Sequence, residues 1–193
     1  MLDSPDQAVL YTSGRASNEA AFLWGLLARQ IGTNNLPDCS NMCHESSGVA
    51  LSSAIGIGKG TVRLECFRHA DLVLVIGQNP GTNHPRMLSA LAETKRNGGS
   101  VISINPLLET GLNRFKHPQE YMELDLTSTQ LADMHLQVKI GGDAALMHGL
   151  LKYCISNGAI DENFIREYCE GFSQMSDNLK NTTWERIVED SGL

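Results

Sequence analysis

The pair of residues best suited to chemistry is Cys43 and His44, because a thiol stands directly beside an imidazole. A thiolate can act as a nucleophile or as a soft metal ligand, and an imidazole can carry a proton. Adjacent side chains of an extended chain point in opposite directions, which makes a direct dyad between the two geometrically awkward. A lone cysteine is also commonly a small buried apolar residue. The residue types therefore leave open whether Cys43 is reactive, bound to a metal or simply buried.

The other cysteines and histidines show no metal-binding pattern. Cys39 and Cys43 are separated by three residues and no second pair follows, which does not match a structural zinc or iron–sulfur site formed by this chain alone. An odd number of scattered cysteines indicates free thiols rather than a disulfide scaffold. Four histidines lack a mutual spacing typical of metal ligands and are interpreted as structural: His69, His117, His135 and His148.

A second group of candidate residues lies in four polar turns, each following a segment predicted to be a strand. In an open α/β sheet, ligands bind beyond the carboxyl ends of the strands, where backbone N–H groups favour anions. Glycines let the backbone approach a phosphate, and an arginine can pair with a pyrophosphate. Each turn alone is also typical of an ordinary connection. The candidate contact residues are Ser13, Gly14, Arg15, Asn18, Gly77, Asn79, Pro80, Gly81, Thr82, Asn83, His84, Asn105, Pro106, Gly141, Gly142 and Asp143.

Short apolar strands must position these turns. Residues 72–76 (LVLVI) predict a central parallel strand buried on both faces, and residues 100–104 (SVISI) predict a second buried strand. Residues 8–12 predict another buried strand, and the alternating segment 135–140 is compatible with an edge strand.

Helices are predicted between and after these strands. Ser17 is a good N-cap for a helix that ends at Gly32, Asp143 is a natural N-cap for a helix to about residue 156, and Gly98 marks the end of a helix over 85–97. Strand, helix and strand in this order form a βαβ unit. The sequence thus predicts a Rossmann-like, doubly wound, mostly parallel sheet with helices on both faces. Further helical segments are predicted at 46–55, 61–69, 162–168 and 184–190.

The usual dinucleotide fingerprint is absent. The glycines at Gly77 and Gly81 have the wrong spacing for G-x-G-x-x-G, and Asn105 stands where an acidic residue would bind the ribose. The pattern argues against an ordinary NAD-dependent dehydrogenase, although an asparagine can still hydrogen-bond a ribose hydroxyl.

Length and charge exclude several classes of protein. With 193 residues, 41% of them hydrophobic, the chain is most simply interpreted as one domain. Fifteen basic against 22 acidic side chains give a net charge of −7, which argues against nucleic-acid and membrane-surface partners. No apolar run approaches the roughly 18 residues of a membrane span, and the opening residues lack the pattern of a signal peptide. We therefore expect a cytoplasmic location.

Several ordered motifs resemble the molybdopterin oxidoreductases, particularly the formate dehydrogenase alpha subunit and its relatives. The segment 31–35 (IGTNN) is followed by 40–47 (SNMCHESS), as in that family, where a Cys or selenocysteine is followed by His. Residues 14–19 resemble the family's first cofactor turn, and residues 77–85 resemble its G-x-N-P-x-x-x-x-P loop. Residues 132–143 resemble its A-D-x-H…K-x-G-x-x stretch.

The resemblance implies a molybdenum bis(molybdopterin guanine dinucleotide) cofactor. Cys43 matches the residue that ligates molybdenum, and His44 matches the neighbour thought to handle a proton during two-electron oxidation or reduction of a small substrate. The turns at 77–84, 105–106 and 141–143 fall where the family binds the guanine dinucleotide. The chain has Asn105-Pro106-Leu107 where formate dehydrogenase has D-P-R, and Glu45-Ser46-Ser47 where it has G-P-S, so ribose, phosphate and substrate contacts are expected to differ.

Family members are several hundred residues long, so the resemblance implies that this chain is a fragment of a catalytic subunit. We expect one cofactor-binding domain over residues 1–193, with residues 1–31 packing against a neighbouring domain of the parent, and no catalytic activity from the fragment alone. A 4Fe-4S cluster and an electron-transfer partner are expected only of the parent. The alternative is a free-standing Rossmann-like module that binds a nucleotide or anion without redox chemistry.

Overall fold

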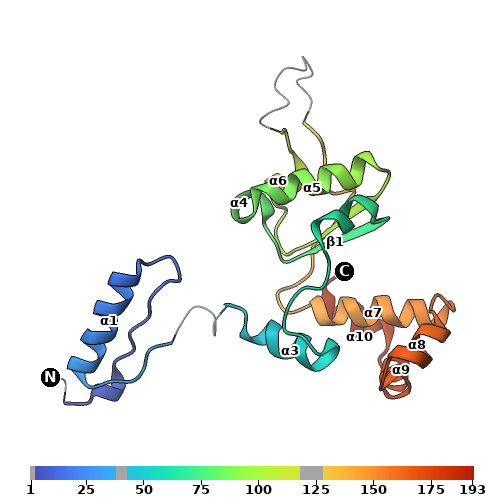
Figure 1. The fold of residues 1–193 in the computed structure, drawn as a ribbon. Coiled ribbons are helices and arrows are strands. Elements are labelled where there is room, and N and C mark those ends of the chain that lie inside the picture. The colour runs from blue at the N-terminus through green and yellow to red at the C-terminus, as the bar shows by residue number, and fades with distance from the viewer. Residues whose placement is uncertain (1–2, 38–42, 118–127) are drawn as a thin grey trace. The chain divides into compact units, whose positions relative to one another are not determined.

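The computed structural model describes residues 3–37, 43–117 and 128–193 (Figure 1). The chain divides into two compact units, Met1–Val62 and Arg63–Leu193. In the first unit the elements are η1 (Pro5–Gln7), α1 (Asn18–Ile31) and α3 (Glu45–Ile55). In the second they are η2 (Leu64–His69), β1 (Leu72–Ile76), α4 (Pro80–Asn83), α5 (Pro85–Arg96), β2 (Ser100–Ile104), α6 (Thr110–Asn113), β3 (Met134–Leu136), α7 (Asp143–Ser156), α8 (Glu162–Tyr168), α9 (Phe172–Asn181) and α10 (Trp184–Ser191).

In the first unit, α1 has the ends that its sequence predicts. The Ser17 side chain accepts a hydrogen bond from the Ala20 N–H at 3.2 Å, and Gly32 ends the helix with a left-handed φ of 95°. The predicted helix at 46–55 is confirmed as α3.

The prediction of a strand over residues 8–12 was wrong. The segment is irregular, and it is held by single hydrogen bonds from Leu10 N to Asn35 O (3.0 Å) and from Thr33 Oγ1 to Ala8 O (3.1 Å). An apolar run becomes a strand only where another strand pairs with it, and no described segment forms a ladder with residues 8–12.

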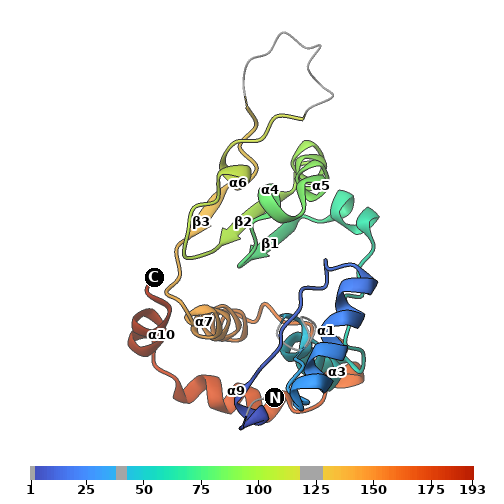
Figure 2. The ribbon, with the colours of Figure 1, turned by 90° about the vertical axis from the view of Figure 1, so that its left-hand side faces the viewer.

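The second unit is built on a three-stranded, fully parallel sheet in the order β1-β2-β3 (Figure 2). Leu72 is in register with Ser100, and Ile102 with Met134. The mixed arrangement of parallel strands and helices is a Rossmann-like α/β fold. His135, interpreted as structural from the sequence, hydrogen-bonds Ser103 at 3.2 Å across β2 and β3.

Strand β1 differs from its prediction in position and in burial. It is an outer strand of the described sheet rather than a central one. Only one of its faces is covered: Val75 is buried, whereas Leu72, Leu74 and Ile76 are 51%, 39% and 44% exposed. The prediction of burial on both faces was therefore wrong, because the run of five aliphatic residues does not say how many faces are covered. The edge strand predicted at 135–140 is confirmed but shorter, at 134–136.

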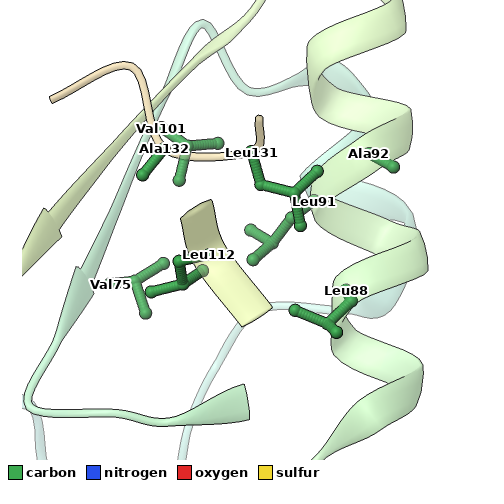
Figure 3. Close-up of a cluster of buried hydrophobic side chains, with 8 residues drawn as sticks. All are labelled: Val75, Leu88, Leu91, Ala92, Val101, Leu112, Leu131 and Ala132. Carbon is green, nitrogen blue, oxygen red and sulfur yellow. The ribbon is translucent and has the colours of Figure 1, made fainter. Parts of the chain in front are cut away.

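Helix α5 covers one face of this sheet and creates the core of the second unit. Figure 3 shows the side chains of Leu88, Leu91 and Ala92 on α5 pointing toward residues of the sheet and its connections. The cluster consists of Val75, Leu88, Leu91, Ala92, Val101, Leu112, Leu131 and Ala132. Burial of each large side chain stabilises the fold by about 1.5–3 kcal/mol. The core thus fixes β1, β2 and the turns that follow them.

The C-terminal helices pack on one another. Helix α7 contacts α10 closely, since a Cβ at Gly149 would lie 2.9 Å from Ile187 Cγ2. The predicted helices at 162–168 and 184–190 are confirmed, whereas α9 was not predicted. Asp143 was wrongly predicted as an N-cap: Gly142 is the N-cap of α7, with no side-chain cap, and Asp143 is the first helical residue. Within the described ranges, no helix is both long and apolar enough to cross a bilayer.

Candidate cofactor site at the carboxyl edge of the sheet

The turns after β1 and β2 lie side by side at the carboxyl edge of the sheet. The Gly77 N–H donates to Ile104 O at 2.8 Å, and the Asn105 N–H donates to Leu136 O at 3.1 Å. The carbonyl of Pro106 in turn accepts from Gln137 Nε2 at 3.0 Å. The parallel strands thus bring together two of the four predicted turns, at the place where such sheets bind ligands.

Asn79 organises the loop after β1. Its Oδ1 accepts from the Thr82 N–H at 3.2 Å, and its Nδ2 donates to Glu109 Oε2 at 2.6 Å. The two polar atoms of this amide are therefore both engaged within the protein. At the end of the same loop, Gln78 Nε2 lies 2.9 Å from His84 Nδ1. The loop is held by side chains on both sides of α4.

Gly81 and Gly111 explain why α4 and α6 lie so close together. A Cβ at Gly81 would lie 3.1 Å from Gly111 Cα, and a Cβ at Gly111 would lie 2.8 Å from Gly81 Cα. Any larger residue at either position would push the two short helices apart. The sequence points to Gly81 as a site of phosphate approach, but its observed neighbour is another backbone.

Asn105 presents a hydrogen-bond donor at the strand end. The side chain is buried, with 8% exposure, and its Oδ1 accepts from the Leu107 N–H at 2.9 Å. Because that N–H can only donate, the Oδ1 position is unambiguous, and the amide nitrogen points elsewhere. No hydrogen bond links Asn105 Nδ2 to another residue that the structure describes. An oxygen acceptor on a ligand would satisfy it.

The turn at Gly141, Gly142 and Asp143 is positioned by α10. A Cβ at Gly142 would lie 2.9 Å from Ser191 O, and the Lys139 N–H donates to Ser191 O at 2.8 Å. Gly142 is therefore required for close packing against the end of α10. No hydrogen bond among the described residues joins this turn to those after β1 and β2.

The remaining candidates lie in the first unit. Ser13 Oγ accepts from the Arg15 N–H at 3.2 Å and Ser13 O accepts from the Ala16 N–H at 3.0 Å, so residues 13–16, which include Gly14, form a tight turn before α1. Asn18 is the first residue of that helix. This turn follows no strand, contrary to its prediction, because residues 8–12 are irregular.

Cys43 and His44 stand at the beginning of α3. His44 is the N-cap, its carbonyl accepts from the Gly48 N–H at 2.8 Å, and its side chain makes no capping bond. Cys43 directly precedes it as an exposed free thiol, so the interpretation as a buried apolar residue does not hold. The chemistry of an accessible thiol fits a soft metal. The described part of the chain holds no group of three metal-ligating side chains, so further ligands to such a metal would come from outside these residues.

Sequence reasoning missed Glu109 and Gly111. Both follow Asn105-Pro106, in a part of the chain for which the sequence predicts no helix or strand. Their contacts join residues about 30 positions apart, and no local pattern reports such a pairing.

A Rossmann-like sheet with polar turns at its carboxyl edge defines a class of nucleotide- and cofactor-binding domains. Comparison with known proteins is specific: the model of the molybdopterin oxidoreductase family matches residues 3–183. The chain belongs to this family.

The chain spans about a quarter of the length of the curated relatives it matches. An uncharacterized oxidoreductase of Mycobacterium tuberculosis is 48% identical over 198 residues, which cover 100% of this chain and 25% of that protein. Protein YdeP of Escherichia coli is 48% identical over 200 residues, covering 98% of this chain and 26% of YdeP. The alpha subunit of F420-dependent formate dehydrogenase 2 from Methanococcus maripaludis is 28% identical over 191 residues, which cover 98% of this chain and 26% of that subunit.

A solved structure shows the same fold. Acetylene hydratase from Pelobacter acetylenicus matches 97% of this chain and 23% of its own, with a TM-score of 0.63 and 19% sequence identity.

Proposed function

We propose that this chain is the cofactor-binding part of a larger, formate-dehydrogenase-like molybdenum oxidoreductase, and that it holds a molybdopterin guanine dinucleotide at the carboxyl edge of its sheet. The observation that carries the proposal is that the turns at Gly77 and Asn105 are adjacent, because the Gly77 N–H donates to the carbonyl of Ile104, the residue before Asn105. The chain that holds these turns belongs to the molybdopterin oxidoreductase family. The 28% identity to a formate dehydrogenase alpha subunit over nearly the whole chain supports the enzyme class.

Asn105 is proposed to donate from Nδ2 to an oxygen of the dinucleotide, either a phosphate or a ribose oxygen. Its Oδ1 already accepts from the Leu107 N–H, so Nδ2 is the group left without a partner among the described residues, whereas an aspartate at this position would offer only acceptors. Backbone groups of the loop 77–84, which includes Pro80, Thr82, Asn83 and His84, are proposed to line the same ligand, whereas Asn79 holds the loop in shape. Gly141, Asp143 and Arg15 remain proposed cofactor contacts.

Cys43 is proposed to bind molybdenum through its thiolate, with His44 as the group that takes or gives a proton at an imidazole nitrogen. The exposure of the Cys43 thiol supports this assignment. When bound, the molybdenum–pterin group supplies two-electron redox chemistry. The contribution of this chain is to present a soft ligand and an adjacent proton carrier immediately before the first turn of α3.

The substrate of the proposed enzyme is a small molecule. The remaining domains of the parent subunit and an electron-transfer partner are proposed to complete the enzyme, with any 4Fe-4S cluster held by those other parts. We propose the cytoplasm as its compartment, which agrees with the free thiols of Cys43, Cys66, Cys154 and Cys169.

The decisive experiment purifies the full-length protein that contains this chain and measures molybdenum by mass spectrometry and guanine nucleotide after acid hydrolysis. We expect molybdenum and guanine nucleotide to co-purify with the protein. Folded protein that carries a nucleotide but no molybdenum would favour the free-standing nucleotide-binding module instead. Folded protein with neither component would reject both functions.

A further inference from the structure

A large cavity lies beside α5. Its volume is about 870 Å³, and its walls come from η2, from α5 and from residues 114–117. Among the described residues, none of the turns at 77–84 and 105–106 lines it. Pro85 and Arg86, the α5 residues that directly follow the first of these turns, do line it. The proposed cofactor site therefore leaves this cavity without a function.

The charge of the cavity wall is opposite to that of the chain. Among the residues that the structure describes, Arg68, Arg86, Arg114 and Lys116 line it, against a single acidic residue, Glu93. The chain as a whole carries a net charge of −7, so four cations in one wall are a local concentration rather than a consequence of composition. Such a wall attracts an anion.

Two of these arginines are available to a ligand. Arg68 Nε binds Glu93 Oε2 at 2.9 Å, which uses the one acid of the wall. Arg86 and Arg114 form no side-chain ion pair or hydrogen bond with another residue in the described ranges. Guanidinium groups bind phosphate oxygens in a bidentate manner, so these two side chains suit a phosphate better than a single carboxylate.

The framework that carries the cations is well held. Thr94 Oγ1 donates to Phe67 O at 2.7 Å, and Asn97 Nδ2 donates to Arg68 O at 2.9 Å, which fixes η2 on α5. The backbones of Phe115 and Thr129 exchange two hydrogen bonds of 2.9 and 2.8 Å, which fixes the neighbour of Arg114. The walls are therefore preformed, as is usual for small-molecule sites.

The cavity also has an apolar side and a helix terminus. Leu64, Leu88 and Phe115 line it together with Pro85 and Arg86, the first two residues of the twelve-residue helix α5. The start of a helix favours negative charge, which adds to the effect of the arginines. The volume lies within the range of roughly 300–1,000 Å³ that is typical of small-molecule pockets.

We propose that this cavity binds a phosphorylated small molecule, with its phosphate between Arg86 and Arg114 and its apolar part against Leu64 and Phe115. The phosphate meets two guanidiniums that form no ion pair with the described residues, and the apolar part covers Leu64, which is 70% exposed. An acidic protein segment would find the same charge, but its carboxylates would gain little from the apolar side formed by Leu64 and Phe115.

The test uses isothermal titration calorimetry on the full-length protein, with phenyl phosphate, inorganic phosphate and phenol as probes. Phenyl phosphate is expected to bind more tightly than inorganic phosphate, and phenol is expected not to bind measurably. Arg114→Gln and Arg86→Gln should each weaken phenyl phosphate by about tenfold or more, as loss of a charged hydrogen bond does. Arg166→Gln on α8 is the matched control, because Arg166 does not line the cavity and its one hydrogen bond to a described residue is to Asn163.

Three results would overturn the proposal. The first is that phenyl phosphate binds the wild type and both cavity variants equally well. The second is that phenol binds as strongly as phenyl phosphate. The third is that an oligoglutamate peptide binds more tightly than phenyl phosphate and that the same variants abolish its binding. Guanine and molybdenum contents are measured on each variant. They should stay at the wild-type level, which separates this cavity from the proposed cofactor site.

Discussion

The Asn79 amide joins two segments that are 30 residues apart, because its Nδ2 donates to Glu109 Oε2 at 2.6 Å while its Oδ1 accepts from the Thr82 N–H at 3.2 Å. Glu109 therefore decides which way the amide points. If the amide turned over, its NH2 group would face the Thr82 N–H, and the first turn of α4 would lose its cap. Glu109 is thus a positioning residue for the loop that follows β1.

Glu109→Ala in the full-length protein is expected to lower the guanine nucleotide content, because the loop loses the partner that orients Asn79. Glu109→Gln should retain most of it, since the amide oxygen can accept the same hydrogen bond. Hydrogen exchange at the Thr82 amide provides a second measurement that does not depend on the cofactor, and it should speed up only in Glu109→Ala. Unchanged exchange in that variant would show that the Asn79 contact does not position the loop.

The Gly81–Gly111 contact changes what a substitution at Gly81 should do. From the sequence alone, Gly81→Val is expected to reduce cofactor binding and to leave the fold largely intact. In the structure a Cβ at this position would lie 3.1 Å from Gly111 Cα, and a valine reaches further. We therefore expect Gly81→Val to destabilise the protein by about 1–3 kcal/mol, as overpacking does, in addition to lowering guanine content.

Chemical denaturation of Gly81→Val and of a control, Gly60→Val, measures this effect. A Cβ at Gly60 would meet no atom within 4 Å, so that variant should stay near the wild-type stability. Equal unfolding midpoints for the two variants would mean that α4 and α6 can separate freely. Loss of guanine without loss of stability would restore the interpretation from the sequence.

Local sequence patterns predicted the elements whose ends are set by nearby residues. Ser17 and Gly32 bound α1, and the apolar runs at 72–76 and 100–104 became β1 and β2. The failures at residues 8–12, at β1 and at Glu109 are non-local. Residues 8–12 form a strand only if another strand pairs with them, and Leu74 is buried only if another element covers its face of the sheet. Glu109 has its role because it contacts Asn79, which lies 30 residues away in the sequence. Of the candidate site, the adjacency of the turns after β1 and β2 could be predicted, but the partners of each side chain could not.

The lowered pKa of Asp133 predicts how the stability of the fold depends on pH. The hydrogen bond from the Lys95 ammonium, followed by that from the Val101 N–H at 2.8 Å, lowers the pKa of the Asp133 carboxyl from its ordinary value. A carboxyl whose pKa is lower in the folded state stabilises the fold fully above its unfolded pKa, about 3.9. This contribution is lost as the pH falls through the lower pKa of the folded state.

Asp133→Asn should therefore destabilise the protein by about 1 kcal/mol at neutral pH, a value kept small because the side chain is 41% exposed. The difference from wild type should shrink below about pH 4. Asp177→Asn, which removes an exposed pair with Lys180, is the control and should have little effect at either pH. Urea unfolding at both pH values makes the comparison, and a difference that is constant with pH would contradict the role assigned to the ionised carboxylate.

The last prediction concerns Cys43, whose thiol is free and exposed at the start of α3. An exposed Cys→Ser change alters stability by no more than about 0.5 kcal/mol, so any large effect of Cys43→Ser must come from chemistry. If the thiolate binds molybdenum, a hard hydroxyl replaces a soft ligand, and turnover should fall while metal held by other ligands stays bound. Cys66→Ser, at another exposed thiol, should change neither. X-ray absorption at the molybdenum edge of the full-length protein would then show one sulfur fewer in the Cys43 variant alone. An unchanged sulfur shell together with full activity would remove Cys43 from the metal site.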